Sequence, residues 1–183
     1  EKARQASCMS NMKQLQLAIL QYAQDYDELL PWYADHDCNA GRKLWYQMIF
    51  PYTRNSQLTT CPSDPAVAVS IGVNYPHPHR CAVASGVPQP GLALAYVQRP
   101  AEVMSLCDTN PGYLVYCRVC YPNGPRAGEP TGRVPTTRHN DGVNVSFLDG
   151  HAKWLRADKL LNIPPGGTPE RADFERLWGH RLD

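Results

Sequence analysis

The first 27 residues carry a single apolar stripe at helical spacing, and this feature constrains the fold more than any other. The stripe consists of Cys8, Met12, Leu15, Ile19, Tyr22 and Tyr26, which recur at alternating intervals of four and three. Such spacing places the side chains on one face of an α-helix. No Pro or Gly interrupts the segment before Pro31, so the sequence predicts one long helix over residues 1–27. An amphipathic helix of this length requires a second layer on which to bury its apolar face.

A second helix and several strands are predicted to follow. The segment 42–50 places apolar side chains on one helical face, and Pro51 is expected to end it. Strands are predicted at 67–75, 92–97, 103–107 and 113–119, because β-branched and aromatic residues there lie between Pro, Gly and Asn.

The strongest local pattern predicts a hairpin. Val143, Val145 and Phe147 alternate with polar residues, and Asp149-Gly150 precedes a second apolar segment. Asp and Gly tolerate positive φ angles, so we expect a two-residue loop with a type I′ turn. Near the C-terminus, residues 169–178 are predicted to form a helix with Thr168 as its N-cap.

The order of these elements predicts an α+β fold in which the long helix packs on an antiparallel sheet. We divide the chain into the helix, 1–27, and a globular part, 28–183, which form a single folding unit because no break in composition separates a second domain. The 17 Pro and 13 Gly indicate long loops.

Composition excludes some classes of function. A formal net charge of +1 gives no basic surface for nucleic acid, which is not an expected partner. No 18-residue apolar run is present that would span a membrane. Seven Cys indicate an oxidising compartment and disulfide-tied loops.

Three stretches together resemble a known family. They are residues 1–28, the sequence Cys61-Pro-Ser-Asp, and residues 139–150, in which a His is followed by nine residues and then Asp-Gly. In this order they resemble type IV pilin-like proteins and major pseudopilins, which carry a prepilin-type cleavage and methylation segment and are similar to general secretion pathway protein G. The segments 76–91 and 110–135 match poorly.

The resemblance implies a structural subunit of an extracellular or periplasmic filament, either a type IV pilus or a type II secretion pseudopilus, that acts by self-assembly. It implies self-association, contact with the secretion or pilus assembly machinery, and a cell-surface or extracellular location after anchoring in the inner membrane. The membrane would be contacted only through an apolar N-terminal segment that this sequence lacks. The alternatives are a secreted module that binds a ligand or metal without forming filaments, and a small secreted redox or hydrolytic enzyme.

The family motif offers no catalytic set, and no catalytic residue is assigned. His139, Asp149 and Gly150 fall at the two ends of a predicted strand, which favours a structural role in turns and hydrogen bonds. Metal ligation or catalysis by His139 is the alternative. The sequence also lacks a G-x-S-x-G elbow, an H-E-x-x-H motif and a phosphate-binding Gly loop, so we do not expect an enzyme.

Six cysteines are candidates for disulfides. Cys8 on the helix stripe and Cys61 in a Pro-containing loop form the favoured pair, which would stabilise the fold by roughly 4 kcal/mol in a chain-entropy estimate. Cys117 and Cys120 are spaced like a redox or metal motif, but their surroundings favour structural disulfides to two of Cys38, Cys81 and Cys107. Cys107 is the candidate for the unpaired thiol.

No cofactor is expected, and two cation sites remain as weaker hypotheses. His77, His79 and Cys81 alternate and would point the same way on an extended chain, as zinc or copper ligands do. A carboxylate group that would suit calcium consists of Asp25, Asp27, Glu28, Asp35 and Asp37. A solvated acidic loop is the favoured interpretation of those carboxylates.

Overall fold

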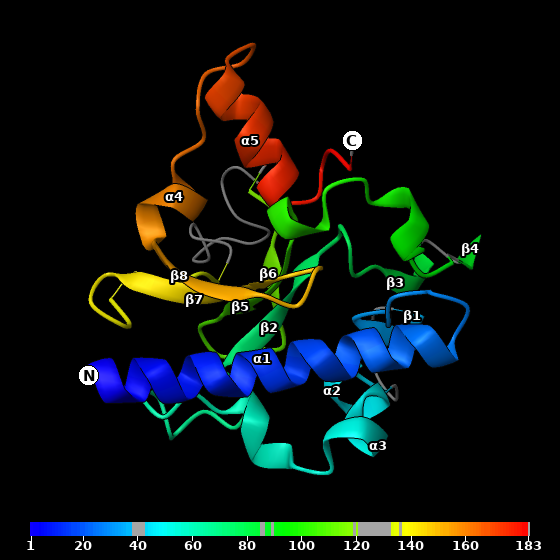
Figure 1. Cartoon of the computed structure of the whole chain (residues 1–183), viewed down its shortest axis with the longest axis horizontal. Helices are drawn as coiled ribbons and strands as arrows, with labels where there is room; N and C mark the ends of the chain where they lie inside the picture. The colour runs from blue at the N-terminus through cyan, green and yellow to red at the C-terminus, as the bar shows by residue number, and fades with distance from the viewer. Residues whose placement is uncertain are drawn as a thin grey trace.

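The computed structural model describes residues 1–37, 43–84, 87–88, 90–118, 120, 133–135 and 137–182, with only the backbone described at 35–37, 81–84 and 87–88. The predicted α+β fold is confirmed. A long N-terminal helix lies across a five-stranded sheet, and a short helix lies near the C-terminus on the opposite side of that sheet (Figure 1).

Helix α1 (Lys2–Asp25) buries the predicted stripe. Its buried face includes Cys8, Met12, Leu15, Ile19 and Tyr22. Tyr26 follows the end of the helix and is 53% exposed, although its ring stacks on that of Tyr22 at a centroid distance of 4.2 Å. The stripe therefore fails only where the helix ends.

The main sheet has the strand order β6-β2-β5-β7-β8. Its strands are β2 (Ile71–Tyr75), β5 (Met104–Asp108), β6 (Leu114–Tyr116), β7 (Gly142–Phe147) and β8 (Ala152–Arg156). The prediction of an antiparallel sheet is wrong at one edge, because β6 pairs parallel to β2 while the other neighbours are antiparallel. After β5 the chain crosses over the start of β2 to the other edge of that strand. There β6 runs alongside β2 in the same direction.

Both faces of this sheet are covered by helices (Figure 1). On one face α1 packs over β5, β7 and β8. On the other, α4 (Ala157–Leu161) and α5 (Pro169–Leu177) enclose a second core that includes Phe147, Leu160, Phe174 and Trp178. Thr168 caps α5 as predicted, since its hydroxyl accepts a hydrogen bond from the Arg171 backbone N–H.

Strand β7 is buried on both faces. Val143, Val145 and Phe147 point into the second core. The polar side chains between them face α1, where the Ser146 hydroxyl donates to Gln16 Oε1 at 3.1 Å and the Asn144 amide donates to the Gln5 carbonyl oxygen at 3.2 Å. The alternating pattern thus separates an apolar layer from a buried polar one, and the helix supplies a hydrogen-bond partner to each of these two polar side chains.

A smaller sheet and several short helices complete the described fold. The small sheet has the order β1-β3-β4, with β1 (Ala34–Asp37) parallel to β3 (Cys81–Ala84) and β4 (Val87–Pro88) antiparallel to β3. The remaining helices are α2 (Trp45–Met48), α3 (Phe50–Thr53) and the 3-10 helices η1 (Ser56–Thr59), η2 (Leu94–Tyr96) and η3 (Pro100–Glu102).

Two sequence predictions fail in this region. The strand expected over 92–97 is instead largely the 3-10 helix η2. Residue 42 of the helix expected over 42–50 lies outside the described residues, and the rest forms a helix only at Trp45–Met48. The chain then continues as a further helical turn, because Pro51 is accommodated in the first turn of α3.

The predicted hairpin forms, but its turn is of another type. The Phe147 N–H donates to the His151 carbonyl oxygen, and the Gly150 N–H donates to the Phe147 carbonyl oxygen. The loop therefore has three residues, and within 148–151 only Gly150 takes a positive φ, of 97°. This arrangement requires one left-handed residue where the type I′ turn requires two. The Asp149 carboxylate caps the turn by accepting a hydrogen bond from the His151 N–H at 3.0 Å.

Within the described ranges, no helix has the length and hydrophobicity needed to cross a bilayer.

Candidate functional site

Four buried side chains meet where the first half of α1 lies against the sheet. Cys8, Cys61, Asp108 and His139 each direct one atom of a metal-binding type into the same small volume, and these atoms all lie within 4.8 Å of one another. The residues come from four segments that are far apart in the sequence. The site therefore exists only because the fold assembles it.

Each residue is held by its local structure. Cys8 belongs to the buried stripe of α1, and Asp108 ends the buried strand β5. Cys61 follows η1, and its backbone N–H donates to the Ser70 hydroxyl at 2.6 Å. These elements fix three of the four side chains in rigid backbone.

His139 lies in an unusual turn just before β7. His139, Asn140 and Asp141 have φ angles of 50°, 59° and 63°, which is a run of left-handed conformations that L-residues rarely adopt. The Trp154 indole N–H donates to the His139 carbonyl oxygen at 2.9 Å, and the Ala157 N–H donates to the Asp141 carbonyl oxygen at 3.1 Å. These hydrogen bonds hold the turn so that the His139 ring points inward.

The contacts within the cluster link all four side chains. Cys8 Sγ lies 3.1 Å from Asp108 Oδ1, and Cys61 Sγ lies 3.2 Å from His139 Nε2. The same Nε2 lies 3.4 Å from Asp108 Oδ2. Two different acceptor atoms thus approach one ring nitrogen.

Groups outside the cluster orient its members. His139 Nδ1 lies 2.9 Å from Glu1 Oε1, and the Ser63 hydroxyl donates to the same carboxylate oxygen at 2.7 Å. Asp108 Oδ2 accepts a hydrogen bond from the Asn144 backbone N–H at 2.7 Å. Glu1 fixes the ring through the nitrogen that faces away from the cluster.

The four groups shift one another's acidity strongly. The Cys8 thiol lowers the pKa of Cys61 to about 4, and His139 adds to this effect although burial opposes it. The contact with Cys61, together with burial, raises the pKa of Cys8 far above its ordinary range. Burial and the charge of Cys61 raise the pKa of Asp108 to about 6. Burial lowers the pKa of His139, but the contact with Cys61 and the charge of Asp108 outweigh it, so that this pKa is raised.

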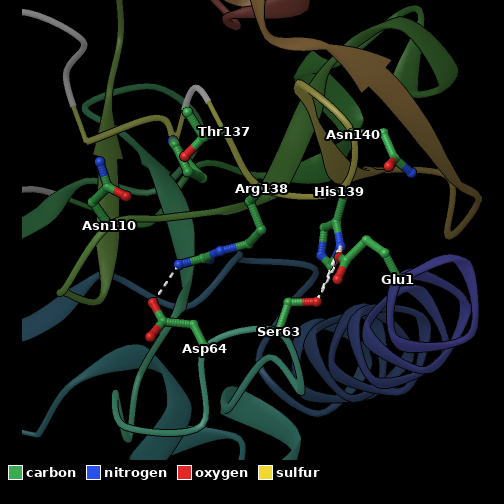
Figure 2. A pocket seen from close by; sticks show the side chains of 9 residues that line it. Glu1, Ser63, Asp64, Asn110, Thr137, Arg138, His139 and Asn140 are labelled. Carbon is green, nitrogen blue, oxygen red and sulfur yellow. Dashed lines mark hydrogen bonds and ion pairs between the residues drawn. The ribbon is translucent and has the colours of Figure 1, made fainter.

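A polar pocket of about 440 Å³ opens beside the cluster, and Figure 2 shows its lining. The His139 ring, Glu1 and Ser63 form the wall nearest the cluster. On another side the Arg138 guanidinium forms an ion pair with Asp64. Solvent in the pocket therefore meets Glu1 and Ser63, while Cys61 behind them is fully buried.

The structure brings the favoured disulfide pair together without bonding it. Cys8 and Cys61 are free thiols, as are Cys107 and Cys120, so no disulfide joins any of these four described side chains. The two thiols contact each other without a covalent bond, and each sulfur approaches a further partner, Asp108 for Cys8 and His139 for Cys61. Cys38, and the side chain of Cys81, lie outside the described residues.

The weaker zinc or copper hypothesis is not supported in the form predicted. His77 and His79 point to different partners, because His79 is buried between the Pro31 carbonyl oxygen and the Ser105 hydroxyl. His77 Nε2 instead lies 3.1 Å from Cys120 Sγ, and these two residues form a second potential metal-binding group with His180 at the surface.

The carboxylates considered for calcium form no such group among the described side chains. Asp25 accepts a hydrogen bond from the Tyr52 hydroxyl at 2.7 Å. Asp27 and Glu28 lie in a left-handed turn after α1, and the side chains of Asp35 and Asp37 are not described.

Sequence analysis missed two participants in the site. Asp108 directly follows a strand that was predicted, and a carboxylate at the end of a buried strand is a pattern that could have drawn attention to it. Glu1 gave no comparable indication, because its role depends on the turn at His139. Asp149 and Gly150 lie in the β7–β8 turn, away from the cluster.

Comparison with known families gives a partial match. The model of a family described as a protein of unknown function, DUF1559, matches residues 1–60, which cover α1 and end just before Cys61. No curated protein and no solved structure matches the chain.

Proposed function

We propose that this chain is a structural subunit of a type IV pilus-like or type II secretion pseudopilus filament, and that it acts by self-assembly. The observation that carries the proposal is the convergence of the three stretches that resemble the pilin-like family. The first helix, the Cys61-Pro-Ser-Asp loop and the His139–Gly150 stretch are separate in sequence, yet Cys8, Cys61 and His139 meet in one buried cluster.

The arrangement of α1 supports this proposal. In a pilin-like subunit the helix must be held firmly by the globular part, because it transmits the contacts along the filament. Here α1 is fixed to the sheet by the cluster near its start and by its apolar stripe further on. A subunit whose helix and sheet are fixed together can make heterologous contacts that repeat along an open filament.

The exposed face of α1 offers a contact surface for neighbouring subunits. It carries Ser10, Lys13, Gln14, Leu17, Gln21 and Gln24. Leu17 is 54% exposed. Leu20, a second leucine off the stripe, lies against the β7–β8 turn, since a methyl group added at Gly150 would be 3.5 Å from its Cδ1. Leu17 is thus the apolar residue that we assign to a contact between subunits.

The proposal includes export, with an extracellular or periplasmic location, anchoring in the inner membrane before assembly, and contact with the secretion or pilus assembly machinery. It also includes a non-catalytic role. Cys61 and His139 are arranged like a nucleophile and its base, with Glu1 on the other ring nitrogen. A substrate carbonyl must nevertheless reach the sulfur, and Cys61 is fully buried behind α1.

Electron microscopy of the full-length gene product, exported by its natural host, tests the proposal. We expect filaments from the wild type and from Gln21→Glu, which adds a charge at an exposed position of the same helix. Leu17→Glu should give far fewer filaments, because burying a leucine contributes about 1.5–3 kcal/mol at each contact. Its circular dichroism and melting temperature should stay unchanged. Exported, full-length protein that remains monomeric would count against the proposal.

A secreted binding module is the second candidate, and the pocket beside the cluster favours it. Its lining combines the Arg138–Asp64 pair with Glu1, Ser63 and Asn110, which suits a small polar ligand. Arg138→Ala would then abolish ligand binding by a protein that forms no filaments. A filament subunit is expected to tolerate this change in assembly assays.

A further inference from the structure

We infer that Cys8, Cys61, Asp108 and His139 bind a structural zinc ion that fastens α1 to the sheet. This inference stands on the cluster itself and goes beyond the proposed filament role. Where the sequence favoured a disulfide and no metal, the structure places four potential ligands around one point.

The set of ligands suits zinc. Structural zinc sites use four side chains, chiefly cysteine thiolates and histidine nitrogens, and also accept carboxylate oxygens. Two thiols, one imidazole and one carboxylate are present here, and each residue offers one ligand atom. Thiolates and imidazole disfavour the hard cations calcium and magnesium.

The distances between the four side chains are also compatible with a shared ion. Ligands about 2.0–2.3 Å from a tetrahedral zinc ion lie roughly 3.3–3.8 Å from one another. The separation of 3.4 Å between His139 Nε2 and Asp108 Oδ2 lies in this range, and the sulfur contacts at 3.1 Å and 3.2 Å lie just below it. His139 Nε2 faces both Cys61 Sγ and Asp108 Oδ2, and one ring nitrogen cannot hydrogen-bond well to both. A cation between them satisfies all three atoms.

The surrounding hydrogen bonds also match a metal site. A histidine that binds metal through one ring nitrogen usually donates its other N–H to a carboxylate. His139 does this with Glu1, through Nδ1 at 2.9 Å. Asp108 is oriented by the Asn144 backbone N–H, so that both non-sulfur ligands have an outer partner.

The burial of these ligands favours a bound cation. All four residues are buried, and three of them become anions when they bind metal. Burying such groups without a compensating charge is costly, whereas a divalent cation neutralises most of their charge. Because four protein atoms fill the coordination sphere, no position stays open for a substrate, which is typical of a structural site.

Metal analysis of the full-length exported protein, purified without added metal or chelator, tests the inference. We expect about one zinc per chain in the wild type. The count should be unchanged in Cys120→Ser, which disrupts the surface group of His77 and His180, and in Cys117→Ser, which alters another buried thiol. Cys8→Ser should lose the zinc.

Two further measurements keep the test decisive if Cys8→Ser does not fold. Wild-type protein in which cobalt replaces zinc should show a thiolate-to-metal charge-transfer band and the visible bands of a tetrahedral site. Glu1→Gln, which keeps all four ligands, should bind zinc about 10–100-fold more weakly in competition with a chelator.

Two results would overturn the inference. One is wild-type protein without stoichiometric zinc whose Cys8 and Cys61 are joined by a disulfide in non-reducing peptide mapping. The other is zinc that Cys8→Ser retains and Cys120→Ser loses, since this would place the ion in the surface group.

Discussion

The buried imidazole of His79 should make the folded protein sensitive to mild acid. His79 is fully buried, and its two nitrogens are both used. Nδ1 donates to the Pro31 carbonyl oxygen at 2.9 Å, and Nε2 accepts from the Ser105 hydroxyl at 3.0 Å. This pattern fixes the neutral ring in one tautomer. Burial lowers the pKa of His79 from 6.5 to about 4, and the Pro31 contact only partly offsets it.

The size of the effect follows from this shift. Above pH 6.5 the ring is neutral in both states and costs nothing. As the pH falls below 6.5 the unfolded chain binds a proton, while the folded chain does not until about pH 4. The free energy of unfolding therefore decreases by about 1.4 kcal/mol per pH unit across this window, or about 3 kcal/mol in total.

Urea unfolding at pH 7, 6, 5 and 4 in wild type and His79→Gln measures this contribution. Glutamine can donate to Pro31 and accept from Ser105 but does not titrate. On acidification to pH 4, the free energy of unfolding of His79→Gln should therefore fall by about 3 kcal/mol less than that of the wild type. His151→Gln, which removes a half-buried imidazole in the β7–β8 turn, serves as the matched control. An NMR titration in which the His79 ring protonates with a midpoint near 6.5 would refute the reasoning.

Two further substitutions test the fold. Gly72→Ala should lower the free energy of unfolding by about 1–3 kcal/mol, because a Cβ there would lie 2.7–2.9 Å from the backbone of Leu114; Gly166→Ala, where nothing lies within 4 Å, should change it by less than about 0.5 kcal/mol. Equal melting temperatures for the two variants would contradict the close approach of β6 to β2. Thr168→Ala should cost about 1 kcal/mol in urea unfolding through loss of the cap to Arg171, and Thr168→Ser should restore it.

The elements that the sequence predicted well are those with a strong local pattern. The stripe of α1, the β7–β8 hairpin and the Thr168 cap each depend on neighbouring residues. The predictions that failed depend on distant partners. The parallel pairing of β6 with β2 and the 3-10 helix η2 follow from where the chain packs, which spacing alone does not encode.

The candidate site, too, was predicted only in part from the sequence. Cys8, Cys61 and His139 were singled out, and the sequence correctly expected the first two to lie together. Asp108 was not singled out, and the meeting of the two thiols with His139 was not foreseen. The run of left-handed residues that begins at His139 contains no glycine. The sequence therefore did not indicate the turn that directs the His139 ring inward.

The spacing between His139 and Asp149-Gly150 is related to the packing of β7 against α1. Just before β7, the turn at His139 places its ring in the cluster with Cys8. Just after β7, Gly150 lies next to Leu20. The twelve residue steps from Cys8 to Leu20 rise about 18 Å along the helix, and the six residues of β7 extend about 20 Å, so the two stretches have similar lengths. The three left-handed residues cost roughly 1 kcal/mol or more each, yet they set the point where β7 begins. We therefore expect that inserting one residue between the two ends of the motif would displace either His139 or Gly150 relative to α1.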